Sequence, residues 1–184
     1  MIPKAQSVTP TGEPDGFVPP RAWRADAFPD GHTRIVVSVP PEELRATHLA
    51  LVRVLSGKLG LRYVQLTDRK VGQLPAPVGR VAMELDAARV LAALEARSRL
   101  IWEDGRHQLW LRGALGEQVI LDELGLVHCS PDDPAFRDAL ESLGIPEGRP
   151  EMMDKRDYVR VAFCADADAE EESLFAELKM LKWK

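Results

Sequence analysis

The adjacent residues His128 and Cys129 have the side chains that a cysteine nucleophile requires, because a reactive thiolate usually forms beside an imidazole. Both fall in an apolar run typical of a strand, where neighbouring side chains point to opposite faces. The His128 imidazole therefore cannot activate the Cys129 thiol, and the histidine partner of this thiol would have to be His107, His48 or His32. We interpret Cys129 as a small buried apolar residue. A small hydrolase or transferase with its site around Cys129 is kept as an alternative hypothesis.

A second candidate for chemistry is the acidic segment that begins at Asp166. The sequence Asp166-Ala167-Asp168 follows an apolar run and resembles the first motif of phosphatases of the haloacid dehalogenase type. That resemblance implies a nucleophilic first Asp and a second Asp that handles the leaving-group proton. Ala169 stands where the motif has Thr or Val, and few residues follow to carry its downstream Lys and acidic pair. We interpret the acids as groups that complement a helix N-terminus, with an enzymatic acidic cluster as the alternative.

Two further kinds of site are not supported by residue spacing. Ser56-Gly57-Lys58 lacks both the Gly five residues before Gly57 and the Ser or Thr after Lys58 that a phosphate-binding loop needs. The four histidines show neither HxH nor HExxH spacing, and the two cysteines are not arranged as CxxC. We therefore expect no cofactor and no metal.

The net charge and the lengths of the apolar runs argue against two classes of partner, nucleic acids and membranes. The formal net charge of −5 argues against nucleic acid, whose binding normally needs a basic face. The sequence has no apolar run of about 20 residues, the length that a membrane-spanning helix needs. The first residues also lack the apolar core of a signal peptide. We expect a cytoplasmic protein with no membrane partner.

The first 32 residues are rich in Pro, Gly and charge and show no sustained period. We predict a Pro-rich extended or disordered arm over residues 1–32, followed by a single α+β domain over residues 33–184. Trp23 lies in this arm. It could either belong to a short linear motif for a partner groove or pack the arm onto its own domain.

The elements of the domain follow from periodicity and from turn and cap residues. Strands are predicted at 34–39, 62–67, 80–85 and 158–164, and helices at 41–59, 87–97, 134–143 and from 167 to the last lysines. Pro41 and Pro134 suit the first helical position. The order predicts a largely antiparallel mixed sheet with about four helices packed mainly on one face.

The centre of the prediction is a hairpin over residues 98–111, where Asp104-Gly105 matches the two positive-φ positions of a type I′ turn. Alternate cross-strand pairs then point to opposite faces. We expect the inner face to carry Leu100, Trp102, His107, Leu109 and Leu111. The outer face carries Arg99, Ile101, Trp110 and Arg112, among polar residues. A second hairpin is expected from 118–121 and 126–129.

The outer hairpin face is the predicted functional surface, because Trp and Arg are enriched at binding hot spots. We predict a non-catalytic protein-interaction or regulatory domain that binds a protein partner. Its predicted partner-binding residues are Arg99, Ile101, Trp110, Arg112 and Trp23. If a helix or the arm covers this face, its Arg and Trp side chains form an ordinary intramolecular cation–π pair instead. A small-molecule sensor with a pocket between sheet and helices is the third hypothesis.

Overall fold

The computed structural model of the chain describes residues 2–67, 78–151, 153–161 and 165–183. Within these ranges the fold is α+β, with an eight-stranded antiparallel sheet, a second sheet of two strands and five α-helices. The large sheet has the strand order β10-β5-β4-β6-β7-β8-β3-β2. Its strands are β2 (Ala22–Ala27), β3 (Thr33–Ser38), β4 (Leu59–Gln65), β5 (Val78–Leu85), β6 (His107–Arg112), β7 (Gln118–Leu121), β8 (Val127–Ser130) and β10 (Leu181–Trp183). The predicted fold class is confirmed.

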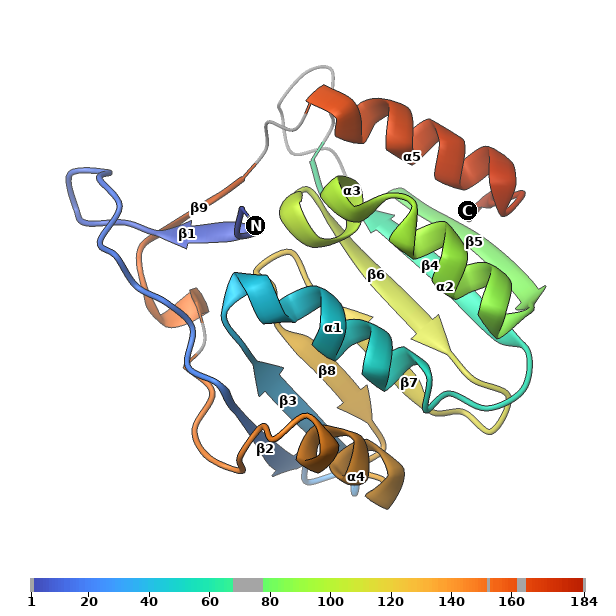
Figure 1. Ribbon diagram of the computed structural model, residues 1–184, viewed down its shortest axis with the longest axis horizontal. Coiled ribbons are helices and arrows are strands. Elements are labelled where there is room, and N and C mark those ends of the chain that lie inside the picture. The colour runs from blue at the N-terminus through green and yellow to red at the C-terminus, as the bar shows by residue number, and fades with distance from the viewer. Residues whose placement is uncertain (1, 68–77, 152, 162–164, 184) are drawn as a thin grey trace.

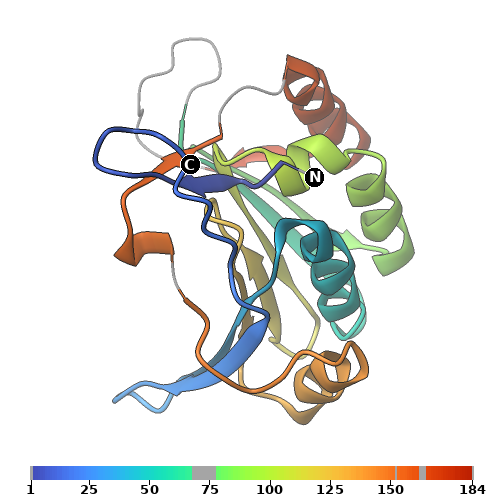
Figure 2. The same cartoon turned by 60° about the vertical axis from the view of Figure 1, so that its left-hand side comes forward.

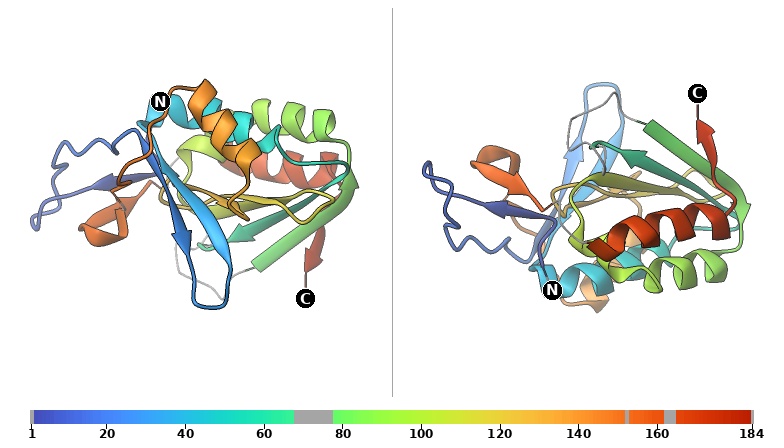
Figure 3. Two further views of the ribbon diagram at one scale, coloured as in Figure 1. Left: turned by 90° about the horizontal axis from the view of Figure 1, so that it is seen from below. Right: turned by 90° about the horizontal axis from the view of Figure 1, so that it is seen from above.

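The described helices cover one face of the large sheet (Figures 1 and 3). They are α1 (Pro41–Val52), α2 (Ala87–Glu95), α3 (Ser98–Glu103), α4 (Pro134–Ser142) and α5 (Ala165–Glu177). The small sheet pairs β1 (Ala5–Ser7) with β9 (Tyr158–Arg160) and lies apart from the large one, near the residues that lead into β6 (Figure 2).

The alternation of side chains along β6 shows how the two faces of the sheet differ. His107, Leu109 and Leu111 are buried and belong to the helix-covered side, whereas Trp110 is half-buried and Arg112 is exposed. A strand with one buried and one partly solvated face normally shows this alternation. The hydrophobic core therefore lies between the sheet and the helices, and the other face keeps polar and aromatic side chains.

Several sequence-based predictions of elements are confirmed. The strand, helix and strand expected from residue 34 onward are β3, α1 and β4, with Pro41 at the start of α1. The helix is shorter than expected, because it ends at Val52 and Leu59 already begins β4. The expected second hairpin is β7 paired with β8. Helix α4 begins at Pro134, and the Asp133 carboxylate accepts a hydrogen bond from the Ala135 backbone N–H (2.8 Å), as expected of an N-cap.

The predicted hairpin over residues 98–111 is wrong, because its first half is helix α3. Leu100, Ile101 and Trp102 are all fully buried, and α3 packs against α1, α2 and α5. A half-exposed strand buries only every second side chain, so three consecutive buried apolar residues are better accommodated by a short helix enclosed on several sides. Arg99 therefore does not face Trp110.

The Asp-Gly pair also has a different role from the one predicted. The backbone of Asp104 is extended, with φ −109°, and its carboxylate accepts a hydrogen bond from the Arg106 backbone N–H (2.9 Å). A Cβ atom on Gly105 would lie 2.2 Å from the carbonyl oxygen of Lys4. Glycine is needed here for the close approach of the N-terminal strand, and not for a type I′ turn.

Both ends of the chain differ in part from expectation. Residues 22–27 of the predicted arm form β2, which pairs with β3, and residues 5–7 form β1; the division at residue 32 stays a prediction. The strand expected at 158–164 is β9 over its first three residues, and 162–164 lie outside the described residues. The last helix ends earlier than expected, and residues 181–183 form the edge strand β10.

Candidate functional site

The face of the large sheet that carries none of the described helices holds several exposed apolar side chains. Its centre, called the open face below, is formed by Arg62, Val81, Met83, Trp110, Arg112, Ile120, Leu181 and Trp183. Met83 is 62% exposed, Leu181 72% and Trp183 51%. Exposed side chains of this size, gathered on one sheet face, are typical of interaction surfaces.

Arg62 is the central residue of the open face. It lies on β4 directly opposite Trp110 of β6, and its guanidinium carbon is 5.1 Å from the centre of the Trp110 ring. From the other side, the same carbon lies 3.6 Å from the centre of the Trp183 ring on β10. Arg62 is therefore held between two indole rings by cation–π contacts, which fix its position while leaving its charge uncompensated.

Two glycines on the open face make room for its large side chains. A Cβ atom on Gly79 would lie 3.1 Å from the Trp183 ring, and one on Gly60 would lie 3.0 Å from the Met83 sulfur. Both distances are tighter than ordinary contacts between carbon or sulfur atoms. Glycine at these positions lets Trp183 and Met83 lie flat against the backbone of the sheet.

Trp110 is fixed by hydrogen bonds as well as by Arg62. Its indole Nε1–H donates to the Gln108 side-chain oxygen (3.0 Å), and the Gln108 amide donates to a Glu123 carboxylate oxygen (2.6 Å). The indole is therefore held in one orientation with its polar atom satisfied. A rigid, half-buried Trp of this kind is well suited to contact a partner at little cost in conformational entropy.

A shallow hollow of about 250 Å³ opens in the middle of the open face. It is lined by Gly60, Leu61, Arg62, Val81, Met83, Trp110, Leu111, Arg112 and Gln118. Its walls thus combine apolar side chains with two guanidinium groups, and it is smaller than the sites that usually enclose a drug-sized ligand.

The charge of the open face is positive and uncompensated within the described part of the chain. Neither Arg62 nor Arg112 forms an ion pair there, although many other arginines do, such as Arg97 with Glu177 at 2.6 Å. The Nε atom of Arg62 is buried and has no hydrogen-bond partner. Unsatisfied cationic groups beside exposed apolar side chains favour a negatively charged binding partner.

The structure separates the residues predicted to bind a partner. Trp110 and Arg112 lie on the open face as predicted, on β6. Arg99 lies on α3 and pairs with Asp166 of α5, and Ile101 is fully buried. Trp23 is 7% exposed, and its indole N–H donates to the Ile145 carbonyl (3.1 Å), so it packs the early part of the chain onto its own domain.

Sequence analysis missed Arg62, Met83 and Trp183. Arg62 and Met83 lie on strands that were predicted, and their alternation with the buried Leu61, Tyr63 and Ala82 is the signal that could have assigned them to the less buried face. That signal does not show which strands are neighbours, so it could not bring them together with Trp110.

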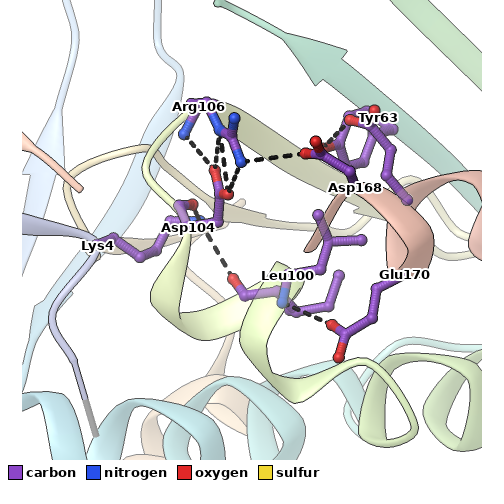
Figure 4. Close-up of polar contacts among 9 residues, drawn as sticks. Lys4, Tyr63, Leu100, Asp104, Arg106, Asp168 and Glu170 are labelled. Carbon is purple, nitrogen blue, oxygen red and sulfur yellow. Dashed lines mark hydrogen bonds and ion pairs between the residues drawn. The ribbon is translucent and has the colours of Figure 1, made fainter. Parts of the chain in front are cut away.

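The acidic residues near the start of α5 attach this helix to other elements (Figure 4). Glu170 accepts a hydrogen bond from the Leu100 backbone N–H (2.8 Å), and Glu171 accepts one from the Tyr63 hydroxyl (2.6 Å). Asp166, as noted, pairs with Arg99. Asp166 and Asp168 lie in the first turn of α5, as expected of acids that complement a helix N-terminus. Asp166, Glu170 and Glu171 in addition have structural partners on α3 and β4.

A buried polar cluster joins α5 to the corner between α3 and β6 (Figure 4). Asp104 is fully buried and forms an ion pair with Arg106 (2.7 Å), which also contacts Asp168 (3.4 Å). The buried Lys4 ammonium donates to the carbonyl oxygens of Asp104 (2.6 Å) and Ile101 (3.1 Å). Buried charges are tolerated when they are paired and hydrogen-bonded in this way.

The remaining candidates for chemistry have no reactive environment. Cys129 is fully buried, and this burial raises the pKa of its thiol far above the usual range, which disfavours the nucleophilic thiolate. His128, its neighbour, points to the other face and contacts Asp122 (3.0 Å). Among the described residues, no group of three or more His, Cys, Asp or Glu side chains could hold a metal ion.

Comparisons with family models, curated proteins and solved structures give no match. None of the helices in the described ranges has the length and apolar character needed to cross a membrane.

Proposed function

We propose that this protein is a non-catalytic protein-interaction domain that binds a protein partner through the open face, and that it acts in the cytoplasm. The observation that carries the proposal is Arg62, which two tryptophans hold in place without any carboxylate partner among the described residues. Trp and Arg dominate binding hot spots because they combine large contact areas with directional polar groups. The exposed Met83 and Leu181 extend this surface.

The environments of the candidate nucleophile and acids also favour binding over catalysis. Cys129 is buried as a thiol, and the carboxylates of Glu170 and Glu171 accept hydrogen bonds that fasten α5. A catalytic site needs convergent reactive groups in one concave pocket. The hollow of the open face is instead lined by apolar side chains and arginines, which supports a contact surface.

The proposal is tested by placing the photo-reactive residue p-benzoylphenylalanine at Met83. Val159 is the matched control position, because it is also an exposed apolar strand residue (49%) but lies on β9 of the small sheet. After illumination in a lysate of the source cells, we expect the Met83 variant to form an adduct with one protein that the Val159 variant does not form. The protein in the adduct is then purified for binding measurements.

The affinity of the intact chain for this purified protein is measured by calorimetry. We expect Met83→Glu to weaken binding at least about tenfold, because truncating or charging a hot-spot contact commonly costs more than 1.4 kcal/mol, while Val159→Glu leaves the affinity unchanged. Urea unfolding of both variants checks that the fold is intact. Equal adducts at both positions, or equal weakening by both substitutions, contradict the proposal.

A further inference from the structure

We infer that the partner presents an acidic, extended segment, in which carboxylates bind Arg62 and Arg112 and a neighbouring apolar side chain fills the hollow beside Met83 and Trp110. This inference rests on the proposed function and specifies the chemistry of the partner. It depends on the two unpaired guanidinium groups and on the apolar hollow beside them.

The strand register brings the two arginines together. Arg112 lies directly opposite Gly60, and Arg62 is two residues further along the same strand, so both side chains are on one face. Such diagonal neighbours in an antiparallel pair are about 7–8 Å apart. The two guanidinium groups lean apart, because that of Arg112 approaches Gly116 in the turn after β6 and that of Arg62 lies over Trp183 of β10. Two carboxylates along an extended segment can each contact one of them.

The hollow supplies the apolar half of the recognition. Met83, Trp110 and Arg112 are among its lining residues, and the Met83 sulfur covers Gly60, where a Cβ atom would lie 3.0 Å from it. Met83 forms a wall that can adapt, because the thioether side chain is unbranched and flexible. Its volume of about 250 Å³ admits an aliphatic or aromatic side chain but not a folded element.

A second copy of this chain is a poorer occupant of the open face. A two-fold contact between two open faces places the same patch on both sides of the interface, so the paired arginines of one copy face those of the other. Neither Arg62 nor Arg112 has a carboxylate from the described residues to offset this repulsion. Like charges opposed in an interface cost several kcal/mol, so an acidic partner is favoured.

Single-stranded nucleic acid is also a poorer occupant, although it commonly stacks on aromatic residues of an open sheet. Arg62 already covers one side of both Trp110 and Trp183, which leaves less indole surface on which a base could stack. The observations therefore favour an acidic peptide segment.

The first experiment selects a displayed library of random dodecapeptides on the immobilised full chain. We expect the selected peptides to be enriched in Asp or Glu next to Leu, Ile, Phe or Trp. The best peptide is synthesised with a fluorescent label, together with a version in which each acid is replaced by its amide. We expect the amide version to bind the full chain about tenfold more weakly.

Matched variants locate the carboxylate. Arg112→Gln is expected to weaken the acidic peptide about tenfold and to leave the amide version unchanged. The control is Arg53→Gln. Arg53 is another solvent-exposed arginine and lies just after α1 on the helix-covered side. Its guanidinium group makes only a long contact with the Glu95 carboxylate, at 3.9 Å, so little is lost when it is replaced. Arg62→Met keeps an apolar stem between the indoles and removes the charge, so it is expected to act like Arg112→Gln. Urea midpoints verify that each variant is folded.

The outcomes separate the inference from the proposed function. Selected peptides without acidic enrichment, whose binding is still lost in Met83→Glu, overturn the inference and leave the proposed function standing. Peptides that bind the Met83→Glu and Val159→Glu variants equally well overturn both. Binding of a labelled single-stranded oligonucleotide that Arg112→Gln abolishes, together with no selected peptide, also overturns both and assigns the face to nucleic acid.

Discussion

His48 makes the stability of this fold depend on pH in a way that can be measured. The side chain is fully buried on α1, and the Trp102 indole N–H donates to its Nδ1 (3.2 Å). Burial, with a smaller contribution from the Lys4 ammonium, lowers the pKa of His48 from 6.5 to about 3. The imidazole is therefore neutral in the folded protein throughout the physiological range.

The sign of the effect follows from proton binding. The folded-state pKa of His48 is depressed, so below pH 6.5 the unfolded chain takes up a proton at His48 that the folded chain excludes. This uptake favours unfolding, and the free energy of unfolding falls as pH decreases from about 6.5 toward 3. At 1.36 kcal/mol per pH unit, the His48 contribution between about pH 7 and about pH 5 is a loss of about 2 kcal/mol.

The assay compares urea unfolding of the wild type and His48→Asn at these two pH values, followed by circular dichroism. Asn offers an acceptor near the position of Nδ1 but does not titrate. Because the two proteins differ only at residue 48, the carboxylates contribute equally to the pH dependence of both, and the difference between the proteins reports on His48. We expect His48→Asn to be less stable at about pH 7, because it leaves a cavity, and the difference from wild type to shrink by about 2 kcal/mol at about pH 5. A difference that stays constant between the two pH values refutes the reasoning.

Two further predictions test the packing described above. Gly105→Ala is expected to lower the free energy of unfolding by about 1–3 kcal/mol in urea titrations, because the new Cβ would lie 2.2 Å from the Lys4 carbonyl oxygen. Gly148→Ala, whose Cβ would lie at an ordinary 3.5 Å from its neighbour, is the control, and an equal loss in both contradicts the close approach. In a Cys164→Ser background, Cys129 is expected to resist a thiol-specific reagent until urea unfolds the chain, since it is fully buried. Rapid labelling of the native protein would show that this burial is wrong.

The element order could be predicted from the sequence because local residues mark the ends of its elements. Pro41 and the Asp133-Pro134 pair define helix starts through backbone geometry and capping, and neither depends on distant contacts. Helix α3 could not be predicted in the same way. The Asp104-Gly105 pair is a strong local signal for a turn, but burial of Trp102 among α1, α2 and α5 outweighs it.

The candidate site was predicted only for β6. The alternation of apolar and other side chains along this strand predicted that Trp110 and Arg112 share one face. This inference does not require knowing which strands lie next to β6. The contact of Trp110 with Arg62 depends on β4 lying between β5 and β6, and the contact with Trp183 depends on β10, which follows a helix end at Lys179 with a positive φ of 51°. A positive φ is uncommon for lysine, so the sequence gives no signal for this reversal.

The strand order of the large sheet has a consequence for how the chain assembles. The β2–β3 and β4–β5 hairpins both come from the first half of the chain, yet they sit apart, with β6, β7 and β8 between them. Each hairpin can form as soon as its own residues leave the ribosome, but the two gain a common core only when the three-stranded meander has been synthesised and inserted. Truncations that end before residue 130 are therefore expected to yield separate hairpins that aggregate through their unpaired strand edges.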